Sequence, residues 1–166
     1  FFSKHFTKDT LFLLPGNHDI YNGYEETALT VFKSIATVYD VPFLDTENVL
    51  WLPYRQEGYT RSEIKKWKRE GASICFTHND FKYLSTRKNN MSREGMDPSI
   101  FDRIQVFNGH YHYPNAHQSI ICMGSQYAVH KTETFDQKKL YTVNVDGTFY
   151  SENVRFGRRE FVYPIN

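Results

Sequence analysis

Cysteine is scarce in this sequence, and no hydrophobic run is long. Only two cysteines occur among 166 residues, Cys75 and Cys122, each inside an apolar stretch and without a C-x-x-C spacing. We expect both to be buried free thiols, which fits a reducing, cytoplasmic location. No apolar run approaches the roughly 20 residues that a membrane-spanning helix needs, so a membrane partner is not expected.

The sequence also lacks a strong net charge. The formal net charge is +1 at pH 7, which creates no overall field to attract nucleic acid. Any DNA binding must therefore depend on a local basic patch or on bound metal ions. At 40% hydrophobic and 17% aromatic residues, the composition is typical of a globular protein. We expect one domain over residues 1–166, with an α/β half at 1–117 and a mostly antiparallel β half at 118–166.

Short apolar runs alternate with amphipathic stretches, which predicts an α/β fold. The continuous apolar run at 11–14 predicts a strand buried on both faces. Further strands are expected at 49–52, 72–76 and 104–107, and helices at 25–39 and 60–70. A capping-box pattern at Thr60–Glu63 opens the second helix and Gly71 ends it.

The C-terminal third has no helical periodicity. Strands are expected at 119–123, 140–145 and 148–154, with Asp146-Gly147 as a tight turn between the last two. Within the first half lies a long polar stretch at 79–98. Long loops of this kind are usually functional or mobile.

The first candidate functional motif is Gly16-Asn17-His18-Asp19, which follows a predicted strand. Pro15 and Gly16 end that strand and let the backbone turn sharply. An asparagine amide oxygen, such as that of Asn17, can bind a metal as a hard, neutral ligand. Asp19 is placed to interact with the His18 imidazole, which would raise its pKa. The alternative is a plain turn, because Asn, Gly and Asp are common turn residues.

The second motif is Gly109-His110-Tyr111-His112, again after a predicted strand. In an extended backbone residues i and i+2 project to one side, so His110 and His112 can reach one metal cluster while Tyr111 points away. Neutral imidazole suits Mn, Fe or Zn. A strand with two exposed histidines is the alternative. His78 lies at the end of a third strand, where it is either a ligand or a structural histidine.

In this order, the three elements resemble the motifs G-N-H-[DE], H and G-H-x-H of the calcineurin-like metallophosphoesterases. That resemblance implies a sandwich of two sheets flanked by helices (αββα), with its N-terminal part absent. The family's first two motifs, D-x-H and G-D-x-x-D, do not occur among the 166 residues. We expect a fragment of a longer protein in which they lie upstream; the alternative is a degenerate relative that has lost its first metal.

The resemblance also implies roles for the motif residues. Asn17, His78 and His110 would bind one divalent ion and His112 the other, in a centre that holds two Mn²⁺ ions, with Mg²⁺, Fe²⁺ or Zn²⁺ as alternatives. His18 would be the general acid, with Asp19 beside it. Without the bridging carboxylate of G-D-x-x-D, we expect this chain alone to be catalytically inactive.

Three further segments resemble one branch of that family, the SbcD-like DNA-repair exonucleases, and most of all the phage recombination endonuclease subunits. They are Asn48–Tyr54, Asn108–Pro114 and Met123–Tyr127. This resemblance implies an Mn²⁺-dependent exonuclease on duplex ends and an endonuclease on single strands. DNA, an SbcC-like coiled-coil ATPase subunit and a second copy of the chain are the partners it suggests.

The segment 81–95 holds a local basic patch. The segment contains four basic residues and one acidic residue, Glu94, which gives a local charge of +3. The basic residues are Lys82, Arg87, Lys88 and Arg93. With Tyr83 as a stacking platform, this patch could follow a phosphate backbone; the alternative is an ordinary solvated loop. Two other functions stay open: a metallophosphoesterase for small phosphoesters, and a non-catalytic binding module.

Overall fold

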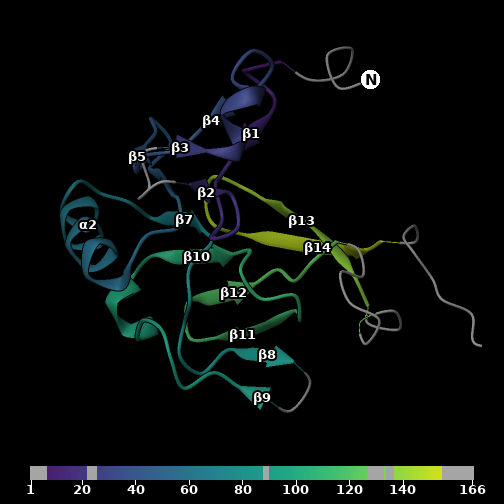
Figure 1. Cartoon of the computed structure of the whole chain (residues 1–166). Coiled ribbons are helices and arrows are strands. Elements are labelled where there is room, and N and C mark those ends of the chain that lie inside the picture. The colour runs from purple at the N-terminus through teal and green to yellow at the C-terminus, as the bar shows by residue number, and fades with distance from the viewer. Residues whose placement is uncertain (1–6, 22–25, 88–89, 127–132, 134–136, 155–166) are drawn as a thin grey trace, which may run out of the picture.

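A mixed six-stranded sheet forms the centre of the fold (Figure 1). The structure is a computed structural model, and it describes residues 7–21, 26–87, 90–126, 133 and 137–154. The order across the sheet is β11-β12-β10-β7-β6-β5. Its strands are β5 (Phe43–Leu44), β6 (Val49–Leu52), β7 (Ile74–Thr77), β10 (Gln105–Asn108), β11 (Asn115–His117) and β12 (Ile120–Cys122). The four central strands are parallel and both edge strands are antiparallel, so the carboxyl ends of β6, β7 and β10 meet at one edge.

One face of the sheet packs against helices. Alternate residues of the parallel strands point to this face and are almost completely buried, as the period of two in a strand requires. The helix α2 (Glu57–Arg69) contributes Ile64, and the short helix η3 (Pro98–Phe101) contributes Phe101. The same core contains Cys75 and Cys122, which are free and buried as expected.

The other face carries a row of aromatic side chains in register. Trp51, Phe76 and Phe107 stack across β6, β7 and β10 with ring centroids 4.9 and 5.4 Å apart. The hairpin of β13 (Lys139–Val143) and β14 (Phe149–Asn153) contacts this row, because Phe149 lies 5.5 Å from Phe107. The predicted hairpin and its turn are therefore confirmed, with Gly147 at φ +84°.

Two predictions for the N-terminal part are wrong. The run at 11–14 gives only β1 (Phe12–Leu13), paired in parallel with β4 (Thr37–Val38), and Phe12 is 43% exposed instead of buried. Residues 26–38 form β3 (Glu26–Thr27, paired with β2, Ile20–Tyr21), a 3-10 helix η2 (Ala28–Phe32) and β4, where the spacing predicted a single helix. Helices are stabilised mainly by burying an apolar face, and two residues of this apolar stripe stay exposed, Val31 at 76% and Phe32 at 38%.

The second predicted helix exists but begins earlier than its capping box. Thr60 lies inside α2, where its hydroxyl donates back to the carbonyl of Gln56 at 3.2 Å. Gln56 is the N-cap and makes no side-chain capping bond. The predicted C-terminal stop is confirmed, because Gly71 adopts φ +96° directly after the helix.

Two segments differ from the expectation of an α/β half at 1–117, with a long loop, followed by a mostly antiparallel half at 118–166. The strand predicted at 119–123 is β12, and it joins the central sheet in parallel beside β10. The segment 79–98 is no open loop: it contains β8 (Ser85–Arg87) and β9 (Asn90–Met91), and it buries Phe81, Leu84 and Met96 completely or nearly so. The described residues thus form an α/β fold, and none of their helices has the length and apolar character to cross a membrane.

Candidate metal centre

Loops from four strands converge at the carboxyl edge of the central sheet. Tyr54, His78 and His110 follow directly after β6, β7 and β10. The loop that carries Asn17 joins them, because the Tyr54 amide donates to the Pro15 carbonyl at 3.0 Å. This convergence is what the parallel pairing of β6, β7 and β10 produces.

The Gly16–Asp19 segment is a tight turn closed by its own aspartate. The Asp19 carboxylate accepts a hydrogen bond from the Gly16 amide at 2.8 Å, and the Asp19 amide donates to the Gly16 carbonyl at 3.1 Å. The predicted pairing of Asp19 with His18 stays a prediction. Within the described residues, the Asn17 amide oxygen is buried and has no hydrogen-bond partner. Burying an unpaired acceptor is costly, which makes this atom a candidate ligand.

His78 lies at the centre of the convergence. A Cβ atom at Gly16 would lie 2.8 Å from His78 Nε2, and one at Gly109 would lie 3.4 Å from His78 Nδ1. The two glycines therefore let both loops approach the ring closely. The His78 and His110 rings meet edge to face, 5.1 Å between centroids.

The surroundings of His78 keep it neutral. Burial lowers its pKa to about 4, helped by the neighbouring imidazoles of His110, His18 and His112 and opposed by Asp80. The other three motif histidines therefore lie within electrostatic reach of His78. A neutral imidazole is the form that binds a metal ion.

His110 is held at one ring nitrogen and open at the other. Its Nε2 lies 2.7 Å from Asp80 Oδ1, and its Nδ1 is buried without a hydrogen-bond partner in the described part of the chain. This hydrogen bond is the main reason why the pKa of Asp80 is lowered. The sequence motifs gave Asp80 no role, and its position two residues after His78 was the only available signal.

His112 is also paired with a carboxylate that the motifs did not indicate. Its Nδ1 lies 2.9 Å from Glu133 Oε1. Glu133 Oε2 in turn contacts the Lys138 ammonium at 3.0 Å, and both of these residues are 8% exposed. Ser125 completes the cluster, since its hydroxyl lies 3.2 Å from Glu133 and 2.8 Å from Lys138. Ser125 belongs to Met123–Tyr127, one of the three segments on which the nuclease resemblance rests.

Buried amides tie the loops together. The Asn79 amide N–H donates to Asn108 Oδ1 at 3.0 Å, and Asn79 Oδ1 accepts from the Arg55 amide at 3.2 Å. Asn79, at 1% exposure, thus connects the chain after β6 and β7 with the last residue of β10. Tyr111 points away from the edge into the core, at 7% exposure, as predicted.

The donor set fits one half of a binuclear centre. It consists of two buried atoms that have no hydrogen-bond partner in the part of the chain that the structure describes, Asn17 Oδ1 and His110 Nδ1, and of the neutral imidazole of His78. Such a mixture of imidazole and amide oxygen suits Mn, Fe or Zn. No group of three or more His, Cys, Asp or Glu side chains in the described residues is arranged to hold a metal ion. Asparagine, the residue type of the candidate ligand Asn17, is not among those four residue types.

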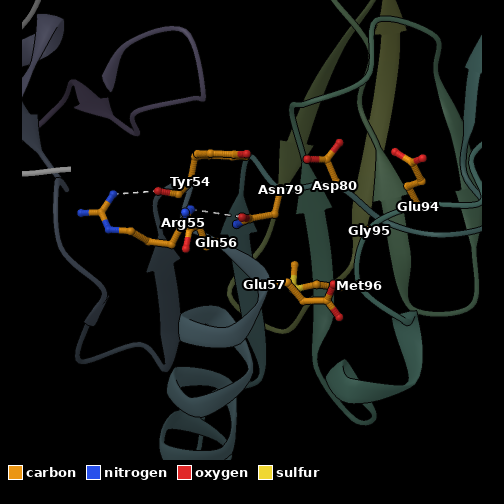
Figure 2. Close-up of a pocket in the computed structure, with 9 residues that line it drawn as sticks. All are labelled: Tyr54, Arg55, Gln56, Glu57, Asn79, Asp80, Glu94, Gly95 and Met96. Atoms are coloured by element: carbon orange, nitrogen blue, oxygen red, sulfur yellow. Dashed lines mark hydrogen bonds between the residues drawn. The ribbon is translucent and has the colours of Figure 1, made fainter. Parts of the chain in front are cut away.

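The pocket beside this edge is acidic. It has a volume of about 240 Å³, and its lining consists of Tyr54, Arg55, Gln56, Glu57, Asn79, Asp80, Glu94, Gly95 and Met96. Figure 2 shows Asp80 and Glu94 on one side, while the Arg55 guanidinium turns away on the other. That guanidinium donates to the carbonyls of Tyr54 and Asp40.

The predicted substrate-binding patch lies elsewhere. None of Lys82, Arg87 and Arg93 lines the pocket, and Lys88 lies outside the described residues. Tyr83 is 45% exposed, with its ring 5.2 Å from that of His117. A DNA backbone that reached both patch and pocket would meet the acidic wall unless cations neutralised it.

Comparison of this chain with protein-family models, with curated proteins and with solved structures gives no match in any of the three. The family resemblance therefore rests on the sequence motifs alone.

Proposed function

We propose that this chain is the metal-binding part of a metal-dependent phosphodiesterase, a DNA exonuclease and endonuclease of recombination and repair. Asn17, His78 and His110 would hold one divalent ion, and His112 would be a ligand of a second. The proposal is supported by two buried ligand atoms, without a partner among the described residues, on loops that pack closely against the neutral imidazole of His78. When bound, a pair of ions supplies activated water and neutralises phosphate charge.

Other residues of the chain would have separate roles in phosphodiester cleavage. Asn17 contributes a neutral oxygen and adds no charge to the centre. His18, on the same turn, would donate a proton to the leaving oxygen, a role that contributes about 10²–10⁴-fold in rate. The hydrogen bond between the Gly16 amide and the Asp19 carboxylate closes the turn, and this turn holds the backbone of Asn17 and His18 in place.

A second candidate is a metallophosphoesterase for small phosphoesters. The acidic pocket favours it, because a volume of about 240 Å³ suits a compact ligand and the basic patch does not line it. A third is a non-catalytic binding module, favoured by the absence of D-x-H and G-D-x-x-D from the sequence.

Calorimetric titration of the 166-residue chain with Mn²⁺ tests the metal site directly. We expect saturable binding that Asn17→Ala and His78→Ala each weaken at least tenfold, and no hydrolysis of bis(p-nitrophenyl) phosphate or linear duplex DNA. If the chain shows no saturable Mn²⁺ binding, the proposed metal site is wrong.

The coding sequence upstream of Phe1 tests the catalytic part. If it continues in frame through D-x-H and G-D-x-x-D, the longer protein should degrade linear duplex DNA with Mn²⁺. Rapid turnover of the small ester without cleavage of DNA would instead support the second candidate. A start codon close to Phe1 with neither motif before it would support the binding module.

A further inference from the structure

We propose that Asp80 is a positioning residue for His110, which holds the ring in the tautomer that presents Nδ1 to the cation. The inference rests on the proposed function, because it assigns a role within that metal site. It starts from the 2.7 Å contact between Asp80 Oδ1 and His110 Nε2.

The contact determines where the proton of a neutral His110 lies. An ionised carboxylate only accepts hydrogen bonds, so the nitrogen facing it must carry the hydrogen. Nε2 is then the donor, and Nδ1 keeps its lone pair. That Nδ1 is the buried atom without a partner in the described residues. Metal-bound histidines commonly donate their other N–H to a carboxylate, which fixes the ring and increases its basicity.

Asp80 is itself held in place by its backbone. Its carbonyl accepts from the Met96 amide at 2.9 Å. Gly95, at φ +95°, packs against it so closely that a Cβ there would lie 2.6 Å from the Asp80 carbonyl carbon. The next residue, Phe81, has both backbone groups bonded to the Tyr111 hydroxyl.

The His110 ring is also confined by other rings. His78 meets it edge to face at 5.1 Å, Tyr111 at 4.9 Å, and Tyr54 is roughly parallel to it at 6.4 Å. A ring held on these sides and bonded at Nε2 directs Nδ1 in one fixed direction. The competing explanation is a simple ion pair between a protonated His110 and Asp80, with no relation to a metal.

Nitrogen-15 NMR of the metal-free chain at pH 7.5 separates these explanations. We expect His110 to show the neutral tautomer with the hydrogen on Nε2. In Asp80→Asn, whose amide can accept or donate, we expect a mixture of the two neutral tautomers. A charged His110, or the tautomer with the hydrogen on Nδ1, in the unmodified chain would overturn the proposal.

Mn²⁺ titration supplies the second measurement. Asp80→Asn should bind Mn²⁺ about 10–100-fold more weakly, the usual effect of losing such a partner. Glu94→Gln is the matched control: it removes the same charge from the same pocket, and no hydrogen bond of its carboxylate is found within the described residues. It should change the affinity less than twofold.

The outcomes distinguish the two proposals. Equal Mn²⁺ affinities of Asp80→Asn and the unmodified chain would overturn the role of Asp80 and leave the metal site intact. Equal losses in Asp80→Asn and Glu94→Gln would also overturn it, because they would show a general effect of charge. If the unmodified chain binds no Mn²⁺, the proposed function fails and the metal-presenting role of Asp80 fails with it.

Discussion

The hydroxyl group of Tyr111 holds both backbone groups of Phe81. It accepts a hydrogen bond from the Phe81 amide at 3.2 Å and donates one to the Phe81 carbonyl at 3.1 Å, across 30 residues of sequence. The contact is buried and locks the loop after β7 to the loop after β10. These are the loops that carry His78 and His110, so this phenol helps to set the geometry of the candidate metal site, together with the Asn79–Asn108 and Asp80–His110 contacts.

Replacing Tyr111 by phenylalanine should destabilise the chain and loosen the site. The change leaves two buried backbone groups unpaired, which costs about 1–3 kcal/mol. Urea unfolding measures the loss, and Mn²⁺ titration should show weaker binding. Tyr150→Phe, at a position that is 60% exposed on β14, is the control and should leave both quantities unchanged. Unaltered stability of Tyr111→Phe would contradict the role of this hydroxyl.

Gly16→Ala should affect metal binding more than folding. The added methyl group would lie 2.8 Å from His78 Nε2, so the ring must move away from its present position. We expect Mn²⁺ affinity to fall at least tenfold. Gly58→Ala is the comparison, because a Cβ there meets nothing within 4 Å inside α2. That variant should be stabilised by about 0.5–1 kcal/mol, as alanine favours a helix over glycine, with unchanged affinity.

The stability of the metal-free chain should fall when the pH is lowered from about 6.5 towards 4. Burial and neighbouring imidazoles lower the pKa of His78 from 6.5 to about 4 in the folded chain. Between these values the unfolded chain binds the proton more readily, so acid favours unfolding. With about 1.4 kcal/mol for each pH unit, the loss is on the order of 3 kcal/mol. Thermal unfolding with EDTA, compared between the unmodified chain and His78→Gln, measures it. An identical pH dependence in both would refute the assignment.

His18→Ala and His110→Ala should separate the two roles given to the motif histidines. His110→Ala removes a proposed ligand, and it should abolish most Mn²⁺ binding. His18→Ala removes a proposed proton donor, so the chain should keep its Mn²⁺ affinity within a few-fold. In a longer protein with the upstream motifs, the same change should reduce cleavage about 10²–10⁴-fold. Equal losses of Mn²⁺ in both variants would contradict the role of His18.

Local sequence patterns determined a large part of the fold. The apolar runs that became β6, β7 and β10 and the Asp146-Gly147 turn of the last hairpin were predictable, because strand periodicity and turn chemistry act over a few residues. The Gly-Asn-His-Asp and Gly-His-Tyr-His motifs were visible for the same reason: each places its candidate ligands directly after a strand. The meeting of the loops after β7 and β10 follows from the parallel pairing of these two strands. The Gly-Asn-His-Asp turn instead follows β1, which pairs with β4 outside the central sheet.

Only the tertiary structure decided the remainder. The apolar spacing at 25–39 is helical, but periodicity does not say whether a surface exists to cover the stripe, and Val31 is 76% exposed. The partners of the motif histidines were hidden for a related reason. Asp80 reaches His110, and Glu133 reaches His112, across intervals of 30 and 21 residues without a fixed spacing. The sequence by itself thus determined which side chains stand at the strand ends, whereas the close approach of distant loops decided which ring nitrogens are bonded and which atoms are left for a ligand.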